Sequence, residues 1–119
     1  MVEVRFTPGG HDRTLIRAGR GGPSTWIDLV CTDSAGFEDY YAAAQELIRG
    51  IGVRPHLGKY CERFDEPDLA GLHGDSFSAF KTLVRAHDPD GKFANAFTRR
   101  LLGSPASIRG SNYPADGGA

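Results

Sequence analysis

The fold of this chain is decided by residues 37–51, which read FEDYYAAAQELIRGI. Apolar side chains recur there at helical spacing and form one continuous stripe, which predicts an amphipathic helix packed against a core. Ser34 is suited to cap the start of this helix, while Gly50 and Gly52 mark its end. The members of the stripe are Phe37, Tyr40, Tyr41, Ala44, Leu47, Ile48 and Ile51.

Residues 2–7, which read VEVRFT, have the pattern of a strand. Apolar and charged side chains alternate, and this is the period of a half-buried strand. Glu3 and Arg5 are therefore expected on one face, and Pro8 ends the strand. The apolar side chains expected to face a core are Val2, Val4 and Phe6.

Residues 24–31, which read STWIDLVC, predict a second strand. Its one charged residue, Asp28, stands in an apolar run. Alternation places Asp28 on the same side as Trp26, so its carboxylate can face outward at little cost. Residues 14–18 are a weaker strand candidate.

Beyond residue 52 the sequence predicts turns and short helices. Pro55 and Gly58 interrupt residues 53–60, which indicates an extended segment with a turn rather than a central strand. The elements expected after it are a helical turn at 67–71 that Pro67 begins, a helix at 76–86 with Phe77, Phe80, Leu83 and Val84 on one face, a turn at 88–91, and a helix at 93–102 that carries Phe93 and ends at Gly103.

Together these patterns predict an α+β domain with a small antiparallel sheet and about three helices. So small a sheet has few strands of its own, and its edges are expected to be open to pairing with other strands. The domain is expected to span residues 1–103. Residues 104–119 are rich in Ser, Pro, Gly and Ala and are expected to form a disordered tail.

The composition limits the possible classes of function. Hydrophobic residues make up 39% and charged residues 24% of the 119 residues, as in an ordinary globular protein. The formal net charge of −1 provides no basic field to attract nucleic acid, and the sparse cluster of Arg99, Arg100 and Arg109 is expected to be solvated. We expect no transmembrane segment and no signal peptide, because Met1 leads directly into a strand pattern.

The two cysteines, Cys31 and Cys61, lack the spacing of a metal site or a redox motif, and the four histidines are scattered. The sequence therefore predicts no metal site. Two reduced, partly buried thiols in a cytoplasmic protein are expected, although a disulfide between them stays open.

Three sets of side chains could carry chemistry. Residues 54–59 read RPHLGK and place the cation of Lys59 on a stiff piece of backbone. Lys59 could hydrogen-bond an electron-rich ring or a substrate hydroxyl. Alternatively, it could be a solvated residue of a surface loop. Glu3 and Arg5 could form an ion pair of little net value, or could together grip a polyhydroxylated ligand. Asp28 could line a polar cavity or face solvent, because burying it unpaired is costly.

The order and spacing of five short segments resemble the end of the aldonolactone oxidase family. This family includes D-arabinono-1,4-lactone oxidases, L-gulono-1,4-lactone oxidases or dehydrogenases, and bacterial alditol oxidases. The resemblance covers residues 2 to about 103. The segments are EVRF at 3–6, STW at 24–26, RPHLGK at 54–59, DPDGKFAN at 88–95 and RRLLG at 99–103.

The resemblance implies a flavoenzyme of the vanillyl-alcohol-oxidase type. In such enzymes an N-terminal domain holds FAD, and a C-terminal domain caps the flavin ring and contacts the substrate. This chain is then part of that C-terminal substrate or cap domain. The implied reaction oxidises a CH–OH group of a sugar lactone or polyol by hydride transfer to flavin.

The resemblance also implies roles for five residues. Glu3 and Arg5 lie on the substrate-binding strand, and Lys59 is the active-site lysine close to flavin and substrate. His56 shapes the segment that carries Lys59 and is counted among the substrate-binding residues. Asp28 falls where relatives carry a polar residue that can line the site. We therefore expect Lys59, Glu3 and Arg5 to converge on one concave face, with Asp28 at its margin.

Two departures from the family pattern bear on the site. Leu57 stands where the family usually has tryptophan, and Asp28 adds a negative charge. The FAD-binding domain is expected outside this sequence, which makes a separate FAD-binding chain a possible partner. Two alternatives stay open: an inactive truncated relic, and a non-catalytic interaction module that uses the open sheet edge. Members of the family can be membrane-associated.

Overall fold

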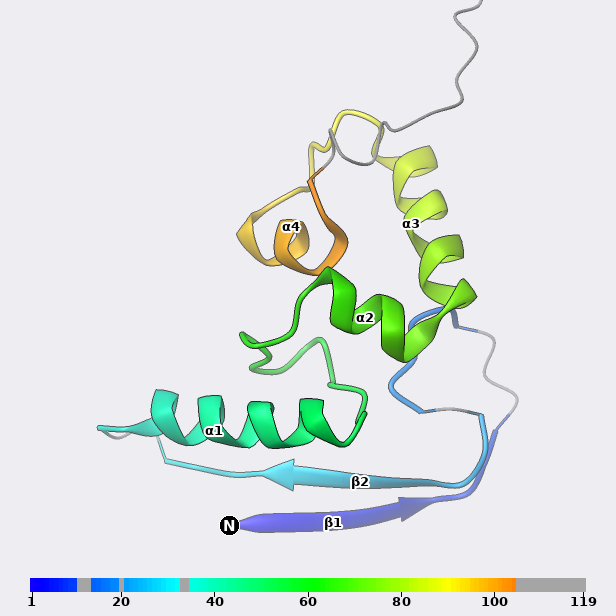
Figure 1. Cartoon of the computed structure of the whole chain (residues 1–119). Coiled ribbons are helices and arrows are strands. Elements are labelled where there is room, and N and C mark those ends of the chain that lie inside the picture. The colour runs from blue at the N-terminus through cyan, green and yellow to red at the C-terminus, as the bar shows by residue number, and fades with distance from the viewer. Residues whose placement is uncertain (11–13, 20, 33–34, 105–119) are drawn as a thin grey trace, which may run out of the picture.

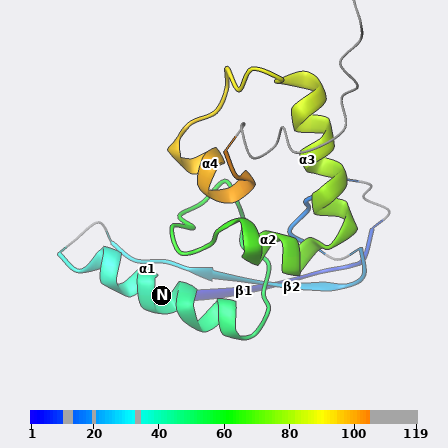
Figure 2. The ribbon, with the colours of Figure 1, turned by 45° about the horizontal axis from the view of Figure 1, so that its top comes forward.

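The computed structural model describes residues 1–10, 14–19, 21–32 and 35–104. Within these residues the chain forms a two-stranded antiparallel sheet and four helices, which confirms the predicted α+β class (Figure 1). The strands and α1 lie together, and α2, α3 and α4 gather beyond them (Figure 2). The elements in chain order are β1 (Val2–Thr7), β2 (Ser24–Leu29), α1 (Phe37–Gly50), α2 (Glu66–His73), α3 (Asp75–His87) and α4 (Ala96–Leu102).

Several predicted boundaries change in the structure. The strand expected at 24–31 ends at Leu29, and the weaker strand expected at 14–18 is wrong, because residues 14–19 lie in turns and bends. The helical turn expected at 67–71 is part of the longer α2. Three features of the sequence analysis lie outside the described residues, namely Ser34, Arg109 and residues 105–119.

The two strands form a ribbon, here called the β1–β2 ribbon, whose faces differ in chemistry. Val4 of β1 lies opposite Ile27 of β2, so apolar side chains of both strands share one face. The expectation that Val2, Val4 and Phe6 point into a core is wrong, because all three are exposed. The buried residues lie among the helices, and no described element covers this face of the ribbon.

Helix α1 uses only part of its apolar stripe. It begins after Gly36, whose φ of 92° lies in the left-handed region that glycine adopts without strain. The one buried side chain of α1 is the polar Gln45, whose Oε1 accepts a hydrogen bond from Arg63 N at 3.0 Å. The stripe residues Tyr40, Leu47 and Ile51 are exposed, whereas Phe37, Tyr41, Ala44 and Ile48 are half-buried.

The core lies between the short helices and the segment that precedes α2. Asp65 caps α2 by accepting a hydrogen bond from Asp68 N at 3.1 Å, and Asp68 accepts one from Asp65 N at 3.0 Å. This capping box fixes the chain between Phe64 and Leu69, which are both fully buried. The buried hydrophobic residues are Cys61, Phe64, Leu69, Phe77 and Leu101.

Helix α4 begins later than the sequence predicts. Asn95 caps it by accepting from Thr98 N at 2.9 Å, and the Thr98 hydroxyl accepts from Asn95 N at 2.8 Å. Phe93 was expected on this helix but lies in the preceding turn, where its amide donates to the Asp88 carboxylate at 3.0 Å. Its ring is exposed, so it adds nothing to the core. Gly103 ends the helix with a φ of 83°, as predicted.

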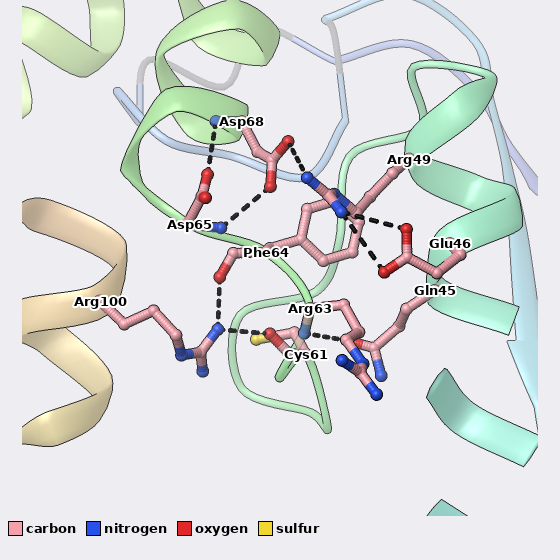
Figure 3. A network of polar contacts seen from close by, with 9 residues as sticks. All are labelled: Gln45, Glu46, Arg49, Cys61, Arg63, Phe64, Asp65, Asp68 and Arg100. Atoms are coloured by element: carbon pink, nitrogen blue, oxygen red, sulfur yellow. Dashed lines mark hydrogen bonds and ion pairs between the residues drawn. The ribbon is translucent and has the colours of Figure 1, made fainter. Parts of the chain in front are cut away.

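Arginine side chains tie the segment before α2 to its neighbours (Figure 3). Arg100 of α4 donates to Cys61 O at 2.9 Å and also to Phe64 O. The expectation that Arg100 is merely solvated is therefore wrong, because loop carbonyls in the interior need donors that the loop itself does not supply. Burial raises the pKa of the Cys61 thiol, and Cys31 and Cys61 are both free.

A second arginine connects α1 with α2 (Figure 3). Arg49 is 3.0 Å from the Asp68 carboxylate and 3.1 Å from Glu46 on its own helix. Burial alone acts to raise the pKa of Asp68, but the hydrogen bonds from Arg49 and Asp65 outweigh it, so that the pKa is lowered. The helices are therefore joined by a charged pair as well as by the core.

Candidate functional site

The first group of predicted site residues lies on the charged face of the β1–β2 ribbon. Arg5 forms ion pairs with Asp28 of β2 and with Glu3, whose Oε1 is 3.4 Å from Arg5 Nε. Because Asp28 lies opposite Glu3, Arg5 reaches it diagonally across the two strands. The hydrogen bond to Asp28, followed by the charges of Asp28 and Glu3, raises the pKa of Arg5. The cluster presents one cation between two carboxylates.

The second group lies on the turn formed by residues 54–60. The Nδ1 atom of His56 accepts a hydrogen bond from Gly58 N at 3.1 Å, and Lys59 N donates to His56 O at 2.9 Å. A Cβ atom at Gly58 would lie only 3.0 Å from His56 Cε1, so the glycine lets the imidazole fold over the turn. Since Nδ1 accepts, the neutral imidazole carries its proton on Nε2. The side chains of His56 and Lys59 are exposed.

Arg54 fixes the beginning of this turn. Its Nε and Nη2 atoms donate to Leu72 O at 3.1 and 2.8 Å, and its Nη1 atom donates to Gly19 O at 3.1 Å. The Leu72 carbonyl lies near the C-terminal end of α2, where carbonyls lack helical partners and a cation is favoured. Arg54 thereby joins the turn to α2 and to the loop that precedes β2.

Aromatic contacts connect the turn with the ribbon. Tyr60, which follows Lys59, packs on Tyr41 of α1 with the two ring centroids 5.3 Å apart. The hydroxyl of Tyr41 donates to Leu29 O at 3.0 Å, and Leu29 directly follows Asp28. Tyr41 therefore links the two groups of predicted site residues through one ring contact and one hydrogen bond.

The structure thus gathers the five predicted site residues into two sets. Glu3, Arg5 and Asp28 form one set, and His56 and Lys59 form the other. In the part of the chain that the structure describes, no hydrogen bond or ion pair runs directly between the sets. Their convergence on one concave face stays a prediction.

Two of the hollows on the surface of the described residues are lined by none of the five predicted site residues. The larger, of about 220 Å³, lies between α1 and the segment around Tyr60. The smaller, of about 180 Å³, lies at the glycine-rich turn end of the ribbon beside Trp26. The predicted site residues therefore lie on open surface of the described chain, where another polypeptide could close over them.

Sequence reasoning missed the contacts that hold this site. Arg54 was considered only as part of a motif, yet it bonds carbonyls 18 and 35 residues away. Tyr41 was placed in a core stripe, but its hydroxyl bonds a strand. No local pattern marks such partners, since backbone carbonyls are identical at every position. The remaining signal was the Arg54-Pro55 pair, because proline restricts the conformation of the residue before it.

Two further features of the described residues bear on function. They contain no group of three or more His, Cys, Asp or Glu side chains that could hold a metal ion. A search of the same residues finds no helix whose length and apolar character suit a membrane span.

Known proteins resemble this chain over most of its length. It is 28% identical over 102 residues to L-gulono-1,4-lactone dehydrogenase of Mycobacterium tuberculosis, a match that covers 86% of this chain and 23% of the relative. It is 31% identical over 104 residues to a long-chain alcohol oxidase of an uncultured marine euryarchaeote, which covers 82% of this chain and 21% of the relative. No solved structure matches the chain.

The chain spans less than a quarter of the length of these curated relatives. Residues 2–101 match the protein family described as D-arabinono-1,4-lactone oxidase, and all five predicted site residues lie within that match. The match covers both strands and the turn that carries Lys59, and it ends within α4. The chain belongs to the D-arabinono-1,4-lactone oxidase family.

Proposed function

We propose that this chain is the substrate-contacting part of an FAD-dependent oxidoreductase that acts on a sugar-1,4-lactone or an alditol. The observation that carries this proposal is the family match over residues 2–101, which includes both sets of predicted site residues. The relatives are more than four times as long as the region they share with this chain, which leaves room outside the match for the FAD-holding part that the proposal requires.

The charged face of the β1–β2 ribbon suits a polyhydroxylated ligand. The Arg5 guanidinium donates hydrogen bonds, while Glu3 and Asp28 accept them from hydroxyl groups. The side chains of Arg5, Glu3 and Asp28 are 60%, 53% and 38% exposed, so each keeps surface free for a ligand beside the ion pairs. The register of β1 and β2 sets the spacing of these groups, and this spacing can orient a bound sugar lactone or alditol.

The Lys59 turn fits a position against a flavin ring and its substrate. Bound FAD supplies the acceptor for a hydride from the CH–OH carbon. Lys59 offers an exposed ammonium group that can stabilise negative charge or hold the reacting hydroxyl, and the Nε2–H of His56 offers a second donor. Arg54 and Tyr60 anchor the turn on both sides, so the backbone that carries these donors is held in place before a ligand binds.

The proposal is tested in a chimaera. The matched region of the mycobacterial relative is replaced by residues 2–101 of this chain, and oxidation of L-gulono-1,4-lactone is followed with an electron-accepting dye. We expect turnover that falls about 10²-fold in Lys59→Met, because the charge is removed while the length of the side chain is kept. Lys92→Met, at another exposed lysine in a turn, serves as the matched control and should leave turnover unchanged.

The strand residues are tested in the same protein. Arg5→Gln and Glu3→Gln should raise KM by roughly tenfold with a smaller effect on kcat, because they weaken substrate binding more than chemistry. A chimaera that folds and binds FAD but turns over no lactone or alditol would favour the relic or interaction-module alternative. Equal turnover in Lys59→Met and Lys92→Met would remove Lys59 from the reaction.

A further inference from the structure

One face of the β1–β2 ribbon is apolar and open to solvent. Phe6 is 78% exposed, Val2 and Ile27 are each 58% exposed, and Val4 is 50% exposed. Ile27 lies directly opposite Val4, and Val2 and Phe6 are the same-face neighbours of Val4 along β1, so the four side chains form one patch. Single apolar residues are normal on a surface, but a contiguous apolar strand face marks an interaction site. We call this patch the docking face.

The same ribbon also has unpaired strand edges. Within the described residues β1 and β2 pair only with each other, so each strand leaves one row of backbone N–H and C=O groups without a strand partner. Such edges accept further strands, and a two-stranded sheet has little stability by itself. A partner that adds a strand and covers the docking face would pair the free backbone groups of the ribbon and bury its apolar side chains.

We propose that the docking face binds the part of a lactone-oxidase-family polypeptide that lies outside the region matching residues 2–101. This inference rests on the proposed function, in which that polypeptide holds the flavin. The matched region is 23% and 21% of the two relatives, so most of each relative lies outside it and can cover the ribbon. The partner contributes an apolar surface and a strand, and it leaves the charged face with Glu3 and Arg5 turned to the substrate.

A second copy of this chain is the less suitable occupant. Each partner in a stable dimer buries about 800 Å². The exposed parts of four side chains supply only part of such an area, and an isologous contact would pair the same four with themselves. The remainder of a family polypeptide can add further surface beside strand pairing, whereas a second copy brings only the same four side chains and the same strand edges.

The test compares one substitution in two settings. Phe6→Lys is made in the isolated 119-residue chain and in chimaeras of both the mycobacterial and the euryarchaeal relative, with Phe93→Lys as the matched control. Phe93 is 74% exposed, nearly as much as Phe6, but lies in the turn before α4. We expect Phe6→Lys to change the Tm of the isolated chain by less than about 2 °C and to lower the Tm of the chimaeras by about 5 °C or more.

The outcomes separate this inference from the proposed function. Equal changes in the Tm of the chimaeras for Phe6→Lys and Phe93→Lys would overturn the proposal that the docking face binds this partner. An isolated chain that is a dimer in sedimentation, and that Phe6→Lys makes monomeric, would overturn it in favour of a second copy. Failure of both chimaeras to fold also counts against it, because the face would then not fit the family's remaining polypeptide. A chimaera with the expected Tm pattern but no lactone turnover contradicts only the proposed function.

Discussion

The helical unit, defined as residues 61–102, and the β1–β2 ribbon are held together in different ways. The helical unit contains all five buried hydrophobic residues, and its interior carbonyls receive hydrogen bonds from Arg100. In the ribbon no side chain is fully buried, every residue of β1 is exposed, and the side chains form ion pairs and hydrogen bonds at the surface. The helical unit therefore has a core of its own, whereas the ribbon depends on strand pairing and, in our proposal, on a partner.

This difference bears directly on the site. The Lys59 turn is anchored to α2 of the helical unit by Arg54, and Tyr60 packs it on Tyr41 of α1, so helices hold the turn on both sides. The predicted substrate-binding residues Glu3 and Arg5 are on the ribbon. In the proposed site, one half is then formed in advance, and we expect the other half to become rigid when a partner covers the ribbon. The predictions below test that division.

The largest expected effect is in the helical core. Phe64→Ala removes a side chain that has no exposed surface, and it should lower the free energy of unfolding by about 3–5 kcal/mol. Urea denaturation of the isolated chain measures this. Phe93→Ala, at an exposed ring, is the control and should stay within about 0.5 kcal/mol of the unchanged chain. Similar losses for both would mean that the core is placed wrongly.

The next effect concerns the carbonyls in the helical unit. Arg100→Met keeps much of the side-chain volume but removes the donors to Cys61 O and Phe64 O, and it should lower the free energy of unfolding by about 2–3 kcal/mol. The neighbouring Arg99 is exposed, so Arg99→Met serves as the matched control. Indistinguishable urea midpoints for the two variants would show that the Arg100 contacts do not stabilise the loop.

A smaller effect is expected at the link between the two regions. Tyr41→Phe keeps the ring against Tyr60 and removes only the hydrogen bond to Leu29 O, which should lower the free energy of unfolding by about 1 kcal/mol. Thermal unfolding followed by circular dichroism detects the change. Tyr40→Phe, one position away on the exposed side of α1, should have no effect. A larger loss in Tyr40→Phe would contradict the proposed link.

The smallest effect depends on pH and lies at the junction of α1 and α2. Because the pKa of Asp68 is lowered in the folded chain, its ionised form stabilises the fold above the unfolded pKa of about 4. That contribution is lost as the pH falls through the folded pKa. Asp68→Asn should therefore lower the free energy of unfolding by up to about 1 kcal/mol near neutral pH, and the difference should vanish in acid. A difference that does not change with pH would exclude the Arg49–Asp68 pair as its source.

The sequence predicted those parts of the fold that depend on local pattern. The apolar spacing in residues 76–86 indicated a helix, which the structure contains as α3. The glycine after Leu102 indicated the end of the last helix, and α4 ends there. The alternation in residues 2–7 correctly indicated a strand. It did not indicate whether another element covers the apolar face of that strand. Period alone states which side chains share a face, and burial depends on whether another element lies against that face.

The core and the site show the same limit. Cys61 and Phe64 are buried in a segment without regular structure, so no helical or strand period could identify them. The motif at 54–59 indicated Lys59 and His56, and the strand pattern placed Glu3 and Arg5 on one face. The ion pair from Arg5 to Asp28 required the register of the two strands, which joins residues 23 apart and follows from no local signal.

The most direct test of the division between the two regions is amide hydrogen exchange of the isolated chain, read residue by residue by NMR. The helical unit should protect the amides of Leu69, Phe77 and Leu101 up to the free energy of global unfolding. The amides of Arg5 and Trp26, a hydrogen-bonded pair between β1 and β2, should exchange through local opening at much lower free energy. In the chimaera with the mycobacterial relative, the protection of Arg5 and Trp26 should rise to that of the helices. Equal protection of the ribbon and the helices in the isolated chain would contradict the account.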